Sequence, residues 1–342
     1  MQQTFAGAGL RYAGAREVAA LAAEAAEELL GVIGFGRIGS GVTGPMPGSG
    51  DLPFARVDMP VIGDDQVYEM WFAAGPVQRE RLGRLQLAHD RQVLFGCIEI
   101  DAEPALEYDA LIYREYCAIF DALDALGYPN LIRIWHYLPD IHLDERGLER
   151  YKRFSLGRHE AFVAKGRAIS RDAPAASAVG KLPGNTVICF LAATRPGTPI
   201  ENPRQVSAWS YPAQYGPRGP TFSRALFTSW GEVPQLYISG TASIFGHASL
   251  HEGDAEAQMA ETLLNLQSVI QEARDQGLVE VGADTDTLIK VYLRRPDLRE
   301  RVELRLREAF GPRAQLVWLQ ADICRGELLL EIEVVCSKRL HD

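Results

Sequence analysis

Cysteine is scarce in this sequence, and its placement excludes several classes of protein. The 342 residues contain five cysteines, at positions 97, 117, 189, 324 and 336, and no two of them form a C-x-x-C pair. An odd number of widely spaced cysteines argues against a disulfide-framed secreted domain and against a zinc site built on neighbouring thiols. The pattern predicts reduced thiols and a cytoplasmic location.

A surplus of positive charge and long apolar runs are also missing. The formal net charge is −10, whereas a nucleic-acid-binding protein needs surplus Lys and Arg to neutralise phosphates. No run approaches the roughly 18 apolar residues of a spanning helix. The N-terminal segment also lacks the basic start and apolar core of a signal peptide. We expect neither a nucleic-acid nor a membrane partner, but a locally basic pocket could still bind a small anion.

The chain has enough apolar residues to form several cores. Apolar residues make up 47% of the sequence and charged residues 23%, which is typical of a globular protein. The length is too great for one small domain and predicts two or three domains of ordinary size.

A glycine motif near the N-terminus raises the question of nucleotide binding. The segment VIGFGRIGSG, residues 32–41, spells G-x-G-x-x-G at Gly34, Gly36 and Gly39, and Asp58 follows 19 residues after the last of these. A dinucleotide-binding turn needs a strand before the glycines and a helix after them. Residues 16–31 are rich in Ala, Glu and Leu and predict a helix, while the residues after the motif are rich in Gly and Pro. The sequence therefore predicts a glycine-rich loop rather than a nucleotide site, with Asp58 in an ordinary strand.

Two later stretches of the chain repeat one order of elements. The paired segments are 93–100 with 236–244, 115–127 with 265–277, 130–140 with 287–297, 148–162 with 298–310, and 185–194 with 326–335. In each stretch the order is strand, helix, strand, helix, strand, and the first helix ends in Gly, a natural C-cap. The repeat predicts two α+β units of the same plan.

The region before these units predicts a third, more divergent copy, because residues 67–76 resemble 187–196. The segment 195–203, which contains Pro and Gly, marks the best boundary between the two clearer copies. We expect three domains, at residues 1–85, 86–200 and 201–342.

The last unit resembles the RidA (YjgF) superfamily. The strand ISGTAS (238–243) and a helix with the pattern G-D-x-x-x-Q…L-x-N (253–270) match that family. RidA imine deaminases carry an Arg, in a P-x-R segment before the last hairpin, that holds the substrate carboxylate. Here Ala314 or Gln315 falls in that slot, which disfavours deaminase chemistry.

Residues 30 to 338 resemble a narrower family, the chorismatases. The segments that carry the resemblance are ENPRQVSAWSYPAQYGPRGPTFSRA (201–225), YISGTASIFGH (237–247) and CRGELLLEIE (324–333). The resemblance implies an α+β fold of three RidA-like domains in a pseudo-threefold arrangement, each a mixed sheet with helices packed on one face. It also implies an active site between the central and C-terminal domains, and a monomer that imitates a trimer.

The chemistry implied by the resemblance is the cleavage of chorismate at its enolpyruvyl ether. This cleavage requires a proton on the methylene carbon, a task suited to a carboxylic acid with a raised pKa. The family's acid corresponds to Glu331, whose apolar neighbours would favour its protonated form. Glu333 shares the same face of the strand, so periodicity alone does not choose between the two carboxylates.

Cys324 precedes Glu331 by seven residues. In the family, a Cys at this position marks the branch that forms hydroxybenzoate, and a small apolar residue marks the branch that forms a dihydrodiol. The resemblance implies that pyruvate leaves through an arene oxide and that Cys324 then assists aromatisation; a buried, inert thiol is the alternative. The segment CRGE (324–327) predicts a hairpin turn with Arg325-Gly326 at its tip. If the turn has two residues, Cys324 pairs with Glu327, roughly 13 Å from Glu331, and thiol and acid bracket a ligand; a bulge or a longer loop would change this distance.

The two carboxylates of chorismate call for cations and hydroxyl donors, and arginine offers forked donors. The candidates lie in the segment 201–225 and in the central unit, and they are Arg158, Arg204, Tyr211, Tyr215 and Arg224. Gly240 either leaves room beside the ligand or forms a strand bulge.

These observations predict an enzyme that converts chorismate to pyruvate and a hydroxybenzoate, chiefly the 3-isomer and in some family members also the 4-isomer, without a metal or redox cofactor. Three alternatives stay open. They are a chorismate hydrolase that gives a dihydroxycyclohexadiene carboxylate, a RidA-type enamine deaminase, and a non-catalytic binder of aromatic acids.

Overall fold

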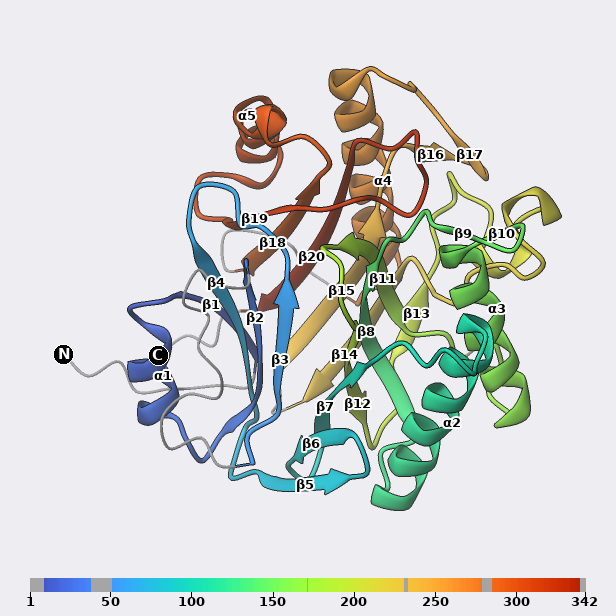
Figure 1. Ribbon diagram of the computed structural model, residues 1–342. Coiled ribbons are helices and arrows are strands. Elements are labelled where there is room, and N and C mark those ends of the chain that lie inside the picture. Colours follow the sequence, from blue (N-terminus) through green and yellow to red (C-terminus); the bar gives the residue numbers. More distant parts are fainter. Residues whose placement is uncertain (1–8, 38–50, 171, 231–232, 279–284, 339–342) are drawn as a thin grey trace.

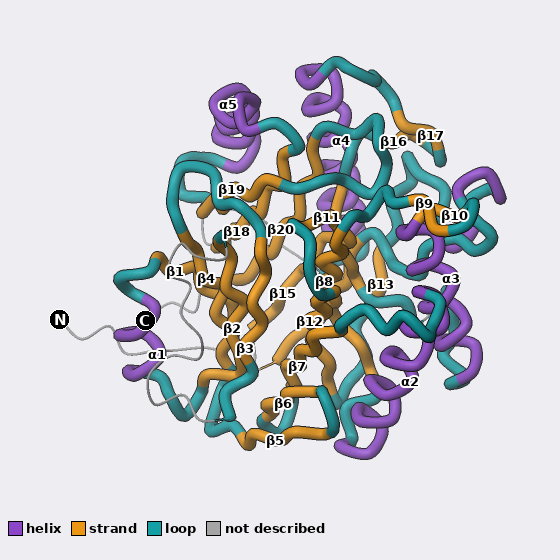
Figure 2. Tube along the Cα trace, in the orientation of Figure 1, coloured by secondary structure: helices purple, strands orange, loops and turns teal. Residues whose placement is uncertain are grey.

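Three β-sheets lie at the centre of the molecule, and the helices lie outside them (Figures 1 and 2). The structure is a computed structural model that describes residues 9–37, 51–170, 172–230, 233–278 and 285–338. No helix within these ranges is long and apolar enough to cross a membrane.

The first sheet has the strand order β1-β4-β2-β3. Its elements are β1 (Gly9–Gly14), α1 (Val18–Glu24), β2 (Leu29–Gly36), β3 (Phe54–Asp58) and β4 (Gln66–Phe72). Strands β2 and β3 run parallel, and the remaining pairs are antiparallel.

The second sheet has six strands in the order β11-β8-β12-β7-β6-β5. Its strands are β5 (Gln78–Leu82), β6 (Leu85–His89), β7 (Val93–Ile100), β8 (Asn130–Pro139), β11 (Ala175–Lys181) and β12 (Thr186–Ala193). Helices α2 (Tyr108–Leu126) and α3 (Arg150–Ala164) pack on its outer face, and a short hairpin, β9 (Asp144–Glu145) and β10 (Leu148–Glu149), precedes α3.

The third sheet also has six strands, in the order β13-β14-β15-β20-β18-β19. They are β13 (Thr198–Ile200), β14 (Ala225–Trp230), β15 (Val233–Thr241), β18 (Thr285–Leu293), β19 (Gln315–Gln320) and β20 (Leu330–Lys338). Helices α4 (Ala255–Asp275) and α5 (Arg299–Phe310) cover its outer face. The short elements are η1 (Ala208–Ser210), η2 (Ala213–Tyr215), β16 (Ile244–Phe245), β17 (Ala248–Ser249) and η3 (Pro296–Leu298).

The predicted repeat is confirmed, but each of the two six-stranded sheets contains three strands more than the three that the sequence suggested. The order β11-β8-β12-β7 of the second sheet corresponds to β19-β18-β20-β15 of the third, and in both the outermost pair is parallel. The first sheet shows the same plan as β3-β2-β4-β1, as expected of a divergent copy. The sequence analysis missed β11, whose seven residues include three Ala and one Gly and have little strand propensity of their own.

Strand pairing begins each later sheet slightly before the expected domain boundaries. Strand β5 precedes residue 85 and β13 precedes residue 201, yet they pair in the second and third sheets. The sheets therefore comprise residues 9–72, 78–193 and 198–338, which we call the first, second and third units.

The first two glycines of the motif, Gly34 and Gly36, lie in a buried strand, so the prediction of a loop at these two positions was wrong. Helix α1 ends at Glu24, and β2 begins at Leu29 and is buried along its whole length, so core packing overrides the helix propensity of residues 25–31. A Cβ atom at Gly34 would press against the rings of Phe54 and Tyr68, so this glycine makes room for aromatic packing. Gly39 and the segment after it lie outside the described residues, while Asp58 ends strand β3 as expected.

The three units share one apolar core between the inner faces of their sheets. Trp71 of the first unit lies 5.2 Å from Trp135 of the second and 6.1 Å from Tyr237 of the third, measured between ring centroids. The outer face of each sheet packs on its own helices in a separate core. Both faces of the central strands are therefore buried, which explains their continuous apolar runs.

Candidate active site

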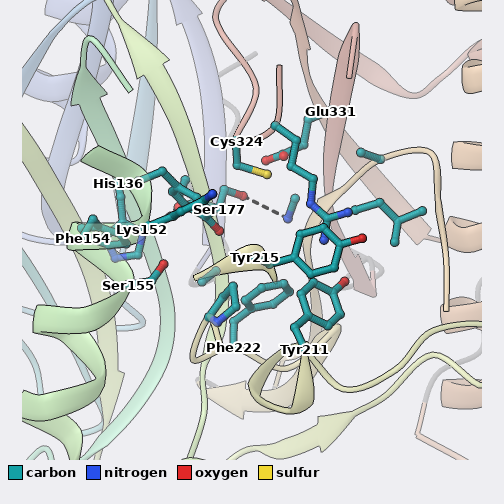
Figure 3. Close-up of a pocket in the computed structure, with 18 of the residues that line it drawn as sticks. His136, Lys152, Phe154, Ser155, Ser177, Tyr211, Tyr215, Phe222, Cys324 and Glu331 are labelled. Atoms are coloured by element: carbon teal, nitrogen blue, oxygen red, sulfur yellow. Dashed lines mark hydrogen bonds between the residues drawn. The ribbon is translucent and has the colours of Figure 1, made fainter. Parts of the chain in front are cut away.

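A cavity of about 190 Å³ lies where the second unit meets the third. The second unit supplies β8, β11 and α3, and the third supplies β15, β20, the segment 205–224 and the loop 324–327. Glu331 and Cys324 lie at one end, the side chains of Tyr211, Tyr215 and Phe222 lie at another, and His136, Phe154 and Ser155 lie on the opposite wall (Figure 3). This location agrees with the expected site between the central and C-terminal domains.

Glu331 lies on β20 next to an irregularity in the neighbouring strand. The register between β15 and β20 shifts between Ile238 and Thr241, so β15 bulges beside Glu331. Gly240, within this bulge, lines the cavity, and a Cβ atom there would overlap Oε1 of Glu331. The predicted bulge is therefore observed, and the space at the glycine is occupied by the carboxyl group of Glu331.

The carboxyl group of Glu331 is held in a setting that favours its protonated form. The residue is 4% exposed, and its Oε1 has no hydrogen-bond partner among the described residues. Burial, with a smaller contribution from the charge of Glu333, raises the pKa of Glu331 to about 8, although Arg133 partly opposes the shift. Glu331 is therefore a buried acid that carries a proton at neutral pH.

Glu333 has the opposite environment, which favours Glu331 over Glu333 as the acid. Its carboxylate accepts hydrogen bonds from Arg133 (2.7 Å), Ser177 (2.6 Å) and Trp135 (2.9 Å), and lies 2.8 Å from the ammonium group of Lys290. Burial alone would raise the pKa of Glu333, but the two cations outweigh burial and hold it below its usual range. Glu333 is thus a fixed anion, whereas Glu331 is the carboxyl group free to exchange a proton with a ligand.

These contacts belong to a buried charge cluster to which every unit contributes. Glu69 of the first unit pairs with Lys290, Lys290 pairs with Glu333, and Glu333 pairs with Arg133 of the second unit. Each of the four residues is at most 5% exposed. Ser177 links the cluster to the site, because its hydroxyl also accepts a hydrogen bond of 3.1 Å from the backbone N–H of Gly240.

Cys324 also lines the cavity, but the expected hairpin was wrong. Strand β19 ends at Gln320 and pairs with β18, while β20 begins at Leu330 between β15 and β18, so a loop rather than a two-residue turn joins them. The separation of roughly 13 Å from Glu331 that a hairpin implies therefore does not apply. Cys324 and Glu331 instead lie side by side (Figure 3), and burial followed by the charge of Glu331 raises the pKa of the thiol to about 12.

Arg158 supplies a buried cation to the cavity from α3. It is 3% exposed, and its Nε and Nη2 lack hydrogen-bond partners among the described residues, where no carboxylate pairs with it. Its guanidinium lies over the rings of Tyr116 and Phe162, 5.5 and 5.6 Å from their centroids. Burial lowers the pKa of Arg158, so the protein holds this charge against its desolvation cost. Such a group is suited to bind an anionic ligand.

Three more of the predicted binding residues line the opposite part of the cavity. Arg224 donates to the hydroxyl of Tyr211 (2.8 Å) and to the carbonyl of Val206 (2.7 Å), and its Nε has no partner among the described residues. The hydroxyl of Tyr215 lies 3.3 Å from Nδ1 of His247. The structure therefore brings Arg158, Tyr211, Tyr215 and Arg224 to one cavity with Gly240, Cys324 and Glu331.

Arg204 is the exception among the predicted residues. It does not line the cavity, and its guanidinium pairs with Glu261 and donates to Oδ1 of Asn265 at 3.0 Å. Both partners lie on α4, so Arg204 ties the segment 201–206 to this helix. The prediction that Arg204 binds substrate is not supported, because its charge is already paired.

The sequence analysis missed several residues that line the cavity. His136 is fully buried and neutral, because burial, reinforced by Arg158, lowers its pKa, and its Nδ1 donates to the carbonyl of Ser177 at 2.7 Å. Thr221 presents a buried hydroxyl with no partner among the described residues, and Arg325 stacks 3.9 Å from the ring centroid of Tyr215. Thr221 and Arg325 lie inside the segments that carry the family resemblance, so their position in the sequence could have marked them as site residues. His136 lies outside these segments, and nothing in the sequence marked it.

The space at Gly240 provides a direct test of the site's geometry. We expect Gly240→Val to reduce kcat/KM by on the order of 10²-fold, because its methyl groups would displace the carboxyl group of Glu331 from its working position. Turnover and thermal unfolding should both be measured. Gly75→Val is the matched control, because no atom lies within 4 Å of a Cβ there. Equal losses in the two variants would contradict the assignment.

The fold and the site together define a class of protein. A single chain carries three units of the same strand order around one core, and one cavity between two of them is lined by a buried, protonated carboxyl group and a buried cation. This architecture is that of a fused pseudo-trimeric enzyme.

Comparison with known proteins identifies the family. Residues 69–192 match the family model described as "Chorismatase FkbO/Hyg5-like, N-terminal". The chain is 34% identical to a 3-hydroxybenzoate synthase of Streptomyces hygroscopicus, over 83% of this chain and 85% of the relative. It is 35% identical to a chorismatase of Streptomyces rapamycinicus, over 91% and 93%. A crystal structure of a chorismatase superposes with a TM-score of 0.83 at 31% identity, and covers 96% of this chain and 98% of that one. The protein belongs to the chorismatase family.

Proposed function

We propose that this protein converts chorismate to 3-hydroxybenzoate and pyruvate. The observation that carries the proposal is the state of Glu331, which lines the cavity with a pKa raised by burial to about 8. A carboxylic acid that is protonated at neutral pH and has no competing hydrogen bond can deliver a proton to carbon. The relatives that are named as chorismatases and as a 3-hydroxybenzoate synthase support the choice of substrate and product.

The reaction begins with transfer of the Glu331 proton to the methylene carbon of the enolpyruvyl group. The ether bond to the ring then breaks as the neighbouring ring hydroxyl takes its place, and pyruvate leaves with its new carbonyl. The hydroxyl proton returns to the Glu331 carboxylate, and an arene oxide remains. Opening of the oxide and loss of a ring proton give the hydroxybenzoate. The atoms of chorismate are divided completely between the two products, so no water is consumed.

Cys324 supports the aromatic product over the dihydrodiol. Its thiol is protonated at neutral pH, because burial and then the nearby charge of Glu331 raise its pKa to about 12. A neutral thiol next to the acid can guide the opening of the oxide without itself attacking the ring as a thiolate. A small apolar residue there would leave space in which water could add.

The cations and hydroxyls of the cavity account for the two carboxylates of the substrate. Arg158 lies on the wall formed by the second unit, and Arg224 with Tyr211 lies on the part formed by the third. Unpaired N–H donors of both arginines are available to a bound carboxylate. Binding at both places would hold chorismate across the boundary between the units.

The decisive experiment is incubation with chorismate and separation of the products by chromatography. We expect pyruvate and 3-hydroxybenzoate in equal amounts. In Cys324→Ala we expect pyruvate release to persist, while the aromatic fraction falls and a non-aromatic diol appears. Cys117→Ala, a half-buried thiol on α2, serves as the control. A diol as the sole product of the unaltered protein would overturn the assignment of product.

The rival functions have weaker support. The position expected to hold the arginine of an imine deaminase carries Ala314, which packs into the helix-covered core, or Gln315 at the start of β19, and neither lines the cavity. A non-catalytic binder would have no use for an acid whose pKa is raised by burial. The monomeric state and the cytoplasmic location stay predictions.

A further inference from the structure

The chain between Cys324 and Glu331 forms an arch, residues 325–329, that no strand pairing supports. One internal hydrogen bond closes it, from the backbone N–H of Leu328 to the carbonyl of Arg325 at 3.1 Å. The thiol lies just before the arch and the acid soon after its end. The conformation of the arch, together with the bridge between Ile323 and Val179 just before Cys324, therefore sets where the thiol lies relative to the acid.

Gln258 of α4 holds the arch from the side of the helix. Its Nε2 donates to the carbonyl of Glu327 at 2.9 Å, and its Oε1 accepts from the backbone N–H of Leu329 at 2.8 Å. The same Nε2 also donates to the carbonyl of His251 at 3.2 Å. Gln258 is completely buried, where an amide is tolerated only when its hydrogen bonds are made. It is the Gln of the G-D-x-x-x-Q motif, for which the reaction itself gives no role.

Arg294, which follows β18, holds the arch from the side of the sheet. Its Nε donates to the carbonyl of Leu328 at 3.0 Å, and its Nη2 donates to the carbonyl of Arg325 at 3.2 Å. Its Nη1 pairs with Asp322, whose backbone carbonyl accepts a hydrogen bond of 2.7 Å from Gly180 of the second unit. Two side chains thus satisfy the carbonyls of Arg325, Glu327 and Leu328 and the N–H of Leu329.

Neither of these side chains lines the cavity, so they act on the reaction through the arch and, for Arg294, also through Asp322 just before Cys324. We propose that Gln258 and Arg294 are positioning residues that fix the Cys324 thiol beside Glu331 and thereby determine which product forms after pyruvate has left. The proposal rests on the proposed chorismatase function. The proposal assigns two steps to different parts of the site. Proton transfer from Glu331 sets the rate of pyruvate release, and the arch sets the ratio of 3-hydroxybenzoate to the diol.

The test measures pyruvate and ring products together for Gln258→Met and for Arg294→Met. In Gln258→Met we expect the fraction of 3-hydroxybenzoate among ring products to fall by about tenfold, while pyruvate release stays within about twofold of the unaltered protein, because a small displacement of a reacting group has a large effect on its step. Arg294→Met should shift the products in the same direction. Thermal unfolding of each variant is recorded, and if Gln258→Met does not fold, Arg294→Met decides the matter.

Thr262→Val is the matched control on the same helix. Thr262 is fully buried, and its hydroxyl donates to the helix carbonyl of Gln258 at 2.8 Å without touching the arch. This variant should lose stability without changing the product ratio. An unchanged product ratio in both Met variants, with pyruvate release lowered in proportion to stability, would overturn the positioning role alone. Absence of pyruvate release by the unaltered protein would overturn the proposed function and, with it, the inference.

Discussion

Replacing Glu331 by Gln is expected to slow pyruvate release from chorismate by about 10³-fold and at the same time to stabilise the protein at pH 8. The loss follows because the amide has no proton to give to the methylene carbon. The gain follows because the folded protein holds the Glu331 carboxyl group in a place where its charged form is disfavoured. This one substitution is therefore expected to lower the rate of pyruvate release and to raise the free energy of unfolding.

The pH dependence of both effects has a definite sign. The pKa of Glu331 is raised from 4.5 to about 8 in the folded state, so the folded protein binds this proton more tightly than the unfolded chain does. The resulting stabilisation is fully present below pH 4.5 and is lost as the pH rises through 8. Within that window we expect the unaltered protein to lose about 1.4 kcal/mol of unfolding free energy per pH unit relative to Glu331→Gln. For the same reason, kcat/KM of the unaltered protein should decline above about pH 8.

Denaturant unfolding at several pH values, together with a pyruvate assay, checks these expectations. Glu300→Gln, an exposed residue of α5, is the control and should change neither quantity. Pyruvate release at the unaltered rate in Glu331→Gln would show that another group is the acid. Equal stability of variant and unaltered protein at pH 8 would show that the burial of Glu331 does not disfavour its charge.

The second large effect is expected from Arg158→Met. We expect kcat/KM for chorismate to fall by on the order of 10²-fold, because a charge-assisted hydrogen bond to a substrate carboxylate is lost. We also expect higher stability, because the variant no longer buries a cation that lacks a carboxylate partner among the described residues. Methionine preserves much of the volume of the side chain over the rings of Tyr116 and Phe162.

Arg167→Met is the matched control for Arg158. Arg167 lies over the ring of Phe120, 4.8 Å from its centroid, but pairs with Asp124 away from the cavity. The Arg167→Met variant should be somewhat less stable than the unaltered protein and should keep the same kcat/KM for chorismate. If Arg158→Met instead destabilises the protein and leaves kcat/KM unchanged, Arg158 supports the fold and does not bind substrate.

Much of the site could be read from the sequence because its residues lie in short, distinctive segments. Glu331, Cys324, Tyr211, Tyr215 and Arg224 were named from such segments, and all of them line the cavity. Arg204 was named for the same reason but is paired with Glu261, since a sequence segment does not show which side chains have partners. His136 could not have been found, because a single His in an apolar strand gives no sign that it faces a cavity.

For the fold, too, the sequence did not show contacts between distant segments. Alternating and apolar runs were enough to predict the repeated units, since those strands pair within their own sheets. Strand β2 was misread because its neighbours come from distant parts of the chain: Gly31 has no side chain where the ring of Phe95, from the second unit, occupies the space. The loop after β19 was misread because β20 pairs with β15 and β18 rather than with the strand that precedes it. Both errors concern contacts between segments far apart in sequence.

The buried charge cluster bears on why three such units should be joined in one polypeptide. In a homotrimer, every side chain near the symmetry axis occurs three times, so one acidic position would place three like charges close together. Here Glu69 comes from the first unit, Arg133 from the second, and Lys290 with Glu333 from the third, and the charges cancel. Within a single chain the three copies need not be identical, so each position near the centre can differ from one unit to the next. This asymmetry at the centre of the molecule allows the interface between the second and third units to carry the active site. The first unit supplies Glu69, the carboxylate that balances the charge of Lys290.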